Sequence, residues 1–259
     1  MKPKTEEFLN FLLWSATLVS QPTSRNLSSS FESWAYRQGL RRQAHVLRRK
    51  KFVESEDSAG DRLYRLTAEG RLHALGGRNP LAQWGRAWDG QWRIVVFDIP
   101  TAREAYRMQL WRRLKERSFG YLQGSVWVTP DSVGPELKRM EEGVINVKSL
   151  LLLEGRPCAG ESDAEIVNGA WDFKQINHRY QQHMKVLAER PERNLQTEAA
   201  AKELQQWAAK EREAWLHAVR WDPLLPEQLW PKGYLGPEAW KRKMQAFRQA
   251  SRQAASFSL

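Results

Sequence analysis

Hydrophobic positions in the first third of the chain follow a helical spacing around a basic segment. Leu40, Ala44 and Leu47 fall at i, i+4 and i+7, which predicts a helix with one apolar face. A shorter helical pattern at residues 31–37 precedes it, and Gly39 marks the turn between the two. The two segments are therefore expected to form a helix-turn-helix pair.

Strand-like patterns follow the second of these helices. Short apolar runs at 52–54 and 63–67 flank a polar stretch at 55–61, which predicts two short strands around a turn-rich loop. Helix, turn, helix and hairpin in this order predict a winged helix-turn-helix. An apolar run at residues 8–19, ahead of these elements, predicts a further buried helix.

The middle of the chain alternates strand and helix patterns. A continuous apolar run ended by Pro100 predicts a buried strand, and Gly124 predicts a bend in a later one. Strand, helix, bent strand, helix and strand in sequence predict a ferredoxin-like βαββαβ unit. Its predicted segments are 92–99, 102–118, 121–129, 137–142 and 147–153. The apolar face of its first helix is expected to hold Tyr106, Leu110, Trp111 and Leu114.

The last third is predicted to be mainly helical, at residues 166–189, 195–219 and 237–250. Prolines prevent a helix between 220 and 236, and the tryptophans there could line a ligand cavity. We therefore expect an α+β protein of three domains. These are a winged-helix DNA-binding domain at 1–80, a ferredoxin-like dimerisation domain at 88–155 and a helical effector or oligomerisation domain at 162–259.

The charge of the chain favours an anionic partner. The formal net charge is +11, and residues 1–87 hold fifteen basic against eight acidic side chains. Cys158 is the only cysteine, which excludes an intrachain disulfide framework and fits a reducing, cytoplasmic location. The apolar run at 8–19 is too short to span a bilayer, so no membrane association is expected.

The basic helix and the predicted wing supply candidate DNA contacts. Residues in the groove-facing helix could reach base edges, while Lys and Arg on the wing could neutralise phosphates. Two other interpretations remain: a solvated helix face, or a winged helix used for protein contacts. The candidates are Arg37, Arg41, Arg42, His45, Arg48, Arg49, Lys50, Lys51, Arg62 and Arg65.

Asp98, at the end of the first predicted strand of the middle domain, is the sharpest catalytic candidate. A carboxylate there could hold Mg²⁺ or Mn²⁺ in a nuclease. An Asp before Ile99-Pro100 could equally cap the next helix, and that structural role is favoured. The chain has no phosphate loop and no nucleophile elbow, so neither a cofactor nor an enzymatic activity is expected.

The assembled pattern resembles the phenylacetic acid degradation repressor (PaaX) family of bacterial transcriptional regulators. The segments that carry the resemblance are 64–70, 88–93, 97–100, 122–127 and 222–226. The resemblance implies the same three domains and a homodimeric repressor on a pseudo-palindromic site in double-stranded DNA. It also implies release by a small effector such as an aryl-acyl-coenzyme A. Basic residues that could meet such a ligand are Arg179, Arg220 and Lys232.

The predicted middle domain is also similar to the small CRISPR-associated nuclease and adaptation subunit, whose strand-end Asp matches Asp98 in motif position. This similarity supports two uses of the fold. One is a dimeric metal-dependent nuclease, and the other is a platform for dimerisation. The main hypothesis is a DNA-binding regulator, with the nuclease and a nucleoprotein adaptor without sequence preference as alternatives.

Overall fold

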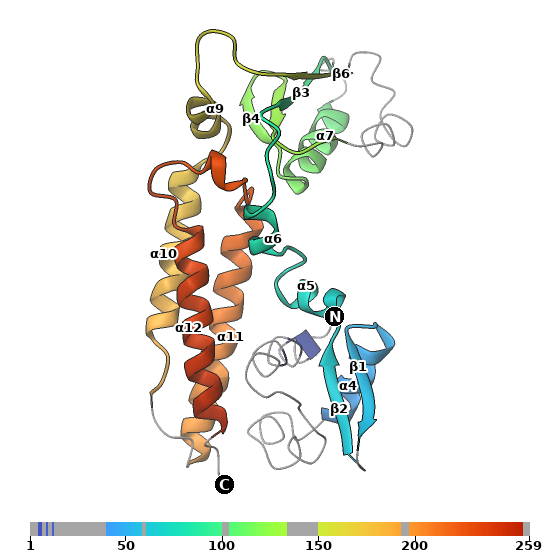
Figure 1. The fold of residues 1–259 in the computed structure, drawn as a ribbon, viewed down its shortest axis with the longest axis vertical. Helices are drawn as coiled ribbons and strands as arrows, with labels where there is room; N and C mark the ends of the chain where they lie inside the picture. The colour runs from blue at the N-terminus through green and yellow to red at the C-terminus, as the bar shows by residue number, and fades with distance from the viewer. Residues whose placement is uncertain are drawn as a thin grey trace. The chain divides into compact units, whose positions relative to one another are not determined.

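The computed structural model describes residues 5–6, 9, 12, 40–58, 61–99, 104–133, 150–192 and 197–255 (Figure 1). The chain divides into two compact units. The helix-bundle unit holds residues 1–79, 177–220 and 235–259, and the sheet unit holds 80–176 and 221–234. These units regroup the segments of the three predicted domains, whose boundaries stay a prediction.

The helix-bundle unit begins, in its continuous part, with a helix and a hairpin. Helix α4 spans Leu40–Arg49, and strands β1 (Val53–Ser58) and β2 (Asp61–Leu66) pair antiparallel from Val53↔Leu66 to Ser58↔Asp61. The expected loop at 55–61 is thus mostly strand, because backbone hydrogen bonds extend the ladder through polar residues that have no apolar pattern. Helix α5 (Ala68–Ala74) follows.

Most of three long helices completes this unit: α10 (Phe173–Ala188) from Asn177 on, α11 (Glu198–Trp221) up to Arg220, and α12 (Gly236–Ala255). They share one apolar core with the helix and hairpin. Ala44 and Leu47 of α4 belong to the same buried cluster as Leu187, Leu204 and Phe247 of the three helices. The isolated described positions Leu9 and Leu12 are buried in this cluster too. The helix and hairpin therefore share part of their buried core with the three long helices.

The helix predicted at 166–189 is two helices. Helix α9 (Asp163–Ala170) ends at Trp171, whose backbone is extended, and α10 begins at Phe173. Asp172 between them accepts a hydrogen bond from the backbone N–H of Gln175 at 2.9 Å, as an N-cap does. Apolar periodicity continues across the break, and so the sequence pattern alone did not locate it.

The sheet unit contains a four-stranded antiparallel sheet in the order β4-β5-β3-β6. Its strands are β3 (Trp92–Phe97), β4 (Gly120–Gln123), β5 (Val126–Thr129) and β6 (Leu150–Gly155). Helix α7 (Glu104–Glu116) connects β3 to β4, and β5 lies between these two strands. This split βαβ order is the one expected from the sequence. The expected bend at Gly124 is the turn of the β4-β5 hairpin, where φ is +56°.

The core of the sheet unit lies between α7 and the sheet. Leu110 and Leu114 of the helix pack with Val95, Phe97 and Trp127 of the strands. Of the four residues expected on the apolar face of α7, Tyr106 is the exception, because 44% of its surface is exposed. The unit also contains α6 (Pro80–Trp84), α9 and the 3₁₀ turn η2 (Glu227–Leu229).

Several predicted elements lie outside the described residues. These are the helix at 31–37, the helix at 137–142 and most of the helix at 8–19. The mixed α+β class is observed, whereas the complete winged helix-turn-helix stays a prediction. Within the described parts of the chain, no helix combines the length and apolar character needed to cross a membrane.

Candidate nucleic-acid interface

Helix α4 presents a basic face opposite its apolar one. Ala44 and Leu47 are buried, as the spacing predicted, while Arg42, His45 and Arg48 are exposed. Arg49, Lys50 and Lys51 continue the exposed basic run beyond the last turn. Arg37 and the side chain of Arg41 lie outside the described part of the chain. The six described candidates thus form one continuous, solvated cationic surface.

The junction after α4 fixes where this surface lies relative to the hairpin. Lys51 has a left-handed backbone with φ of +59°, and the N–H of Phe52 donates to the carbonyl of Leu47 at 3.0 Å. The hydroxyl of Thr67, beyond β2, donates to the carbonyl of Lys51 at 2.7 Å. The Lys50 ammonium lies 6.0 Å from the ring centre of Phe52. Both ends of the hairpin are therefore tied to the end of the basic helix.

The segment 64–70 supplies the residues for this junction. Thr67 caps α5 by accepting from the N–H of Gly70 at 2.9 Å. A Cβ at Gly70 would lie 2.0 Å from the carbonyl oxygen of Phe52, so only glycine permits this approach. His73 stacks on Phe52 with ring centres 4.6 Å apart, and burial lowers the pKa of its imidazole. These residues position α4 without touching its basic face.

The two wing candidates occupy defined register positions. Arg65 is opposite Glu54, and Arg62 is opposite Asp57. Their side chains lie outside the described part of the structure. Because residues directly opposite in an antiparallel pair share one face of the ladder, each wing arginine has an acidic neighbour by register.

Asp98 follows β3 and is exposed. Among the described residues, no group of three or more His, Cys, Asp or Glu side chains is placed to hold a metal ion. The described residues therefore form no such three-ligand group around Asp98, and its metal-binding role stays an alternative prediction.

The three effector candidates belong to different parts of the fold. Arg179 is half-buried on α10, Arg220 is exposed on α11, and both are in the helix-bundle unit. Lys232 is exposed in a turn of the sheet unit. A hollow of about 520 Å³ in the sheet unit is lined by Trp88, Arg156 and the exposed Cys158, among others, and by none of the three candidates.

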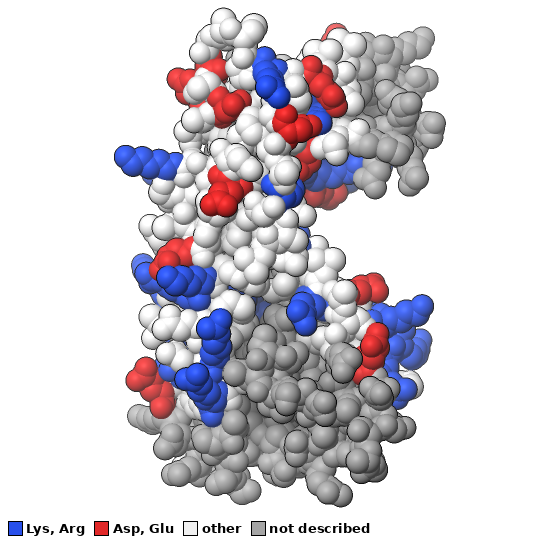
Figure 2. All heavy atoms as spheres, viewed as in Figure 1, with Lys and Arg blue, Asp and Glu red and all other residues white. Residues whose placement is uncertain are grey.

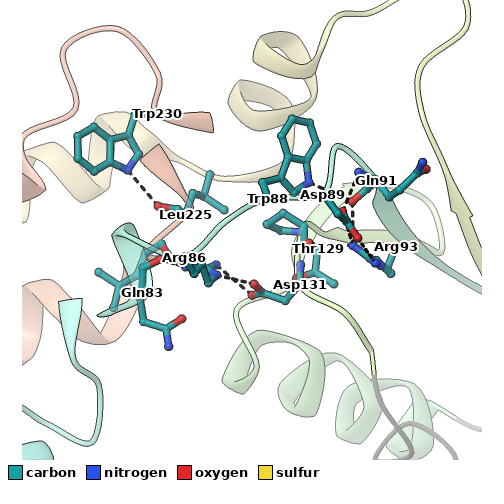
Figure 3. A network of polar contacts seen from close by, with 12 residues as sticks. Gln83, Arg86, Trp88, Asp89, Gln91, Arg93, Thr129, Asp131, Leu225 and Trp230 are labelled. Carbon is teal, nitrogen blue, oxygen red and sulfur yellow. Dashed lines mark hydrogen bonds and ion pairs between the residues drawn. The ribbon is translucent and has the colours of Figure 1, made fainter. Parts of the chain in front are cut away.

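A polar network in the sheet unit uses the segments 88–93 and 222–226 (Figure 3). Arg93 is buried and donates to Asp89 and to Glu154, the latter at 3.2 Å. The hydrogen bond from Arg93 lowers the pKa of Asp89, and the same contact raises the pKa of Arg93. Trp88 donates to the carbonyl of Gln91 at 3.1 Å.

Arg86 forms the second half of the network. Its guanidinium donates to both carboxylate oxygens of Asp131, at 2.6 and 3.1 Å (Figure 3). It also donates to the carbonyls of Gln83 and Leu224. Asp222 in turn accepts from the N–H of Leu224 at 2.8 Å. These motif residues therefore hold loops in place, and none of them adds to the cationic surface.

Two domains of one protein family match the chain, and a solved structure has a similar fold. Residues 85–167 match the central Cas2-like domain of PaaX proteins, and residues 171–259 match the PaaX-like C-terminal domain. An uncharacterized protein from Mycobacterium tuberculosis has a similar fold, with a TM-score of 0.57 and 18% identity over 95% of this chain and 96% of that one. No curated protein matches the sequence.

Proposed function

The chain belongs to the PaaX family, since two PaaX domains together account for residues 85–259, and from this premise we propose that it is a transcriptional regulator that binds double-stranded DNA. The proposal covers a cytoplasmic homodimer that represses transcription from a pseudo-palindromic operator. A small effector such as an aryl-acyl-coenzyme A releases it. The observation that carries DNA binding is the exposed cationic surface of α4.

The geometry of α4 suits a duplex. Its basic residues are solvated on one face while its apolar face is fixed in the core by Ala44 and Leu47. In a winged helix-turn-helix, such a helix enters the major groove and the hairpin lies over the phosphates. Arg42, His45 and Arg48 would then face base edges, and Lys50 and Lys51 the backbone. Arg37, Arg41, Arg49, Arg62 and Arg65 complete the proposed contacts.

Strand β6 supports the dimer. Among the described strands it lies at the edge of the sheet and pairs with β3, and its Leu151, Leu152 and Leu153 are 59%, 39% and 49% exposed. A strand at a sheet edge has unpaired backbone N–H and C=O groups, and exposed leucines on it favour burial against a partner strand. Two copies of one strand can pair antiparallel about a two-fold axis, which is the symmetry that a palindromic operator requires. The proposed occupant of this edge is therefore β6 of a second copy.

The effector proposal requires cations for the coenzyme A phosphates. Arg179, Arg220 and Lys232 are the proposed contacts. A ligand releases the repressor only if it binds the DNA-free arrangement more tightly than the DNA-bound one, because equal affinity shifts no equilibrium. Residues of α4 and of the three long helices belong to one buried core. We therefore expect a ligand that binds at α10 or α11 to change the position of α4 through this core.

Binding to duplexes from the protein's own upstream region tests the function. Affinity is measured against scrambled competitor at several salt concentrations, with and without Mg²⁺. A regulator is expected to bind tightly in the presence of competitor and to leave the DNA uncut. If scrambled competitor displaces the upstream duplex, the protein is instead an adaptor without sequence preference. Mg²⁺-dependent cutting of the DNA would indicate a nuclease.

Two variants separate the regulator from the nuclease. Replacing Lys50 and Lys51, the proposed phosphate contacts, by Gln is expected to weaken DNA binding and to lower the slope of log Kobs against log salt by about two, since each phosphate contact adds about 0.9 to the slope. Asp98→Asn, which alters no basic residue, is the matched control and should leave specific binding intact. If Asp98→Asn abolishes a metal-dependent cleavage, the regulator proposal is wrong.

A further inference from the structure

Helix α12 exposes a second cationic surface. Lys241, Arg242, Arg248 and Arg252 are exposed and follow the spacing i, i+1, i+7 and i+11, which places them along one side of the helix. We call these four residues the α12 basic face. Glu238 pairs with Arg242 at 2.7 Å, and no acidic residue follows it in the remaining 21 positions of the chain.

The neighbouring helix α11 carries charges of both signs on its exposed positions. Lys202, Lys210 and Arg220 are exposed there together with Glu203 and Glu213. On α12 the exposed positions between the cations are instead Gln245 and Gln249. Arg248 and Arg252 lie four residues apart and repel each other on the helix surface. Arg252 in the last turn still gains from the helix dipole, whereas Arg248 does not. Arg248 and Arg252 form no ion pair with any residue that the structure describes.

The α12 basic face belongs to the same compact unit as α4. Phe247 and Ala250, in the turns that carry Arg248 and Arg252, belong to the buried cluster that includes Ala44 and Leu47 of α4. Figure 2 shows Lys and Arg side chains both over α12 and beside α4. Since both helices contribute to one core, the two basic surfaces belong to the same unit, and that unit is the one that would bind the duplex.

We propose that the α12 basic face contacts DNA phosphates that flank the segment bound by α4. Arginine, lysine and glutamine are side chains that commonly contact the sugar-phosphate backbone, and they supply affinity without sequence information. This inference rests on the proposed function, because it extends the footprint of the same DNA complex. A duplex longer than the segment read by α4 would therefore bind more tightly than a short one.

The test compares two variants that lose the same charge. Arg248→Gln with Arg252→Gln alters the α12 basic face, and Lys202→Gln with Lys210→Gln removes two exposed cations from α11. Gln keeps helix propensity in all four positions. The slope of log Kobs against log salt is expected to fall by about two in the α12 variant, with affinity on the order of tenfold lower at 0.15 M salt. The α11 variant should match the wild type.

Each outcome separates this inference from the proposed function. If the wild type binds no duplex, the proposed function fails first. If the wild type binds and the α12 variant keeps its slope, only the α12 contact is wrong. An equal loss in both variants would mean that net charge alone matters, and this overturns the contact too. Loss of binding to vesicles containing 30% phosphatidylserine, with the DNA slope unchanged, would assign the surface to a membrane instead.

Discussion

Single residues at the start of α5 determine how the end of α4, and with it the basic face, is positioned. Gly70 lets α5 lie against the carbonyl of Phe52, and Thr67 joins the same turn to Lys51. Neither residue carries charge, yet both belong to the segment that resembles the family at the wing. Their contribution is therefore to the position of the cationic surface, and their loss should affect stability and DNA binding together.

Gly70→Ala is expected to destabilise the helix-bundle unit by about 2 kcal/mol or more. The added methyl would overlap a backbone oxygen, which cannot move as a flexible side chain can. Urea unfolding followed by circular dichroism measures the change. Gly155→Ala is the control, because a Cβ there meets nothing within 4 Å. Equal effects of the two substitutions would contradict the close approach at Gly70.

At the scale of elements, three helices meet at a buried charged cluster that the sequence did not reveal. Glu211 of α11 accepts from Lys243 of α12 at 2.6 Å and contacts the imidazole of His183 of α10 at 2.8 Å. All three side chains are at most 1% exposed. The Lys243 ammonium also lies 4.0 Å from the ring centre of Phe247, which belongs to the core beneath α4. The cluster thus joins the bundle helices next to that core.

Lys243→Met is expected to destabilise this unit by about 3–5 kcal/mol, because it leaves the buried carboxylate of Glu211 without its cation. Adding Glu211→Gln should recover more than half of the loss, since the unpaired charge is then gone. Thermal unfolding of the single and double variants measures both. Lys241→Met, on an exposed position of the same helix, should change stability by no more than about 0.5 kcal/mol.

His183 of the buried cluster and His73 beside Phe52 together predict a pH dependence of stability. Burial lowers the pKa of His183 and of His73 below 6.5, so the unfolded chain binds these protons at a higher pH than the folded chain does. The free energy of unfolding that the two neutral histidines contribute is therefore fully present above pH 6.5. It is lost as the pH falls below that value. Unfolding between pH 7.5 and 5.5 should show this slope. His183→Gln should reduce the slope and leave the remainder to His73, and an unchanged slope would contradict the prediction.

At the scale of the whole molecule, the exposed edge of β6 bears on the oligomeric state. Leu151→Lys with Leu153→Lys is expected to convert the proposed dimer to a monomer, because an antiparallel strand pair would bring like charges together. Sedimentation equilibrium measures the mass. Leu81→Lys is the control, since Leu81 is 56% exposed on α6 and lies away from the strand in sequence. A wild type that is itself monomeric would remove β6 as the interface.

Local patterns in the sequence determined the elements that depend on neighbouring residues. Leu40, Ala44 and Leu47 predicted α4 and its buried side, and the apolar run from Trp92 predicted β3. The basic cluster, the α+β class and the family resemblance followed from residue types in order along the chain. Helix periodicity and charge are properties of short segments, which is why they can be recognised without a fold.

Only the tertiary structure decided which distant residues meet. Gly70 is indispensable because of Phe52, and Glu211 finds His183 and Lys243 on two other helices. The structure also placed residues of α4 and of the long helices in one buried cluster, a contact that no pattern in the sequence predicted. Such contacts depend on packing between segments far apart in the chain, and neither hydrophobic period nor composition encodes the partner of a buried polar group.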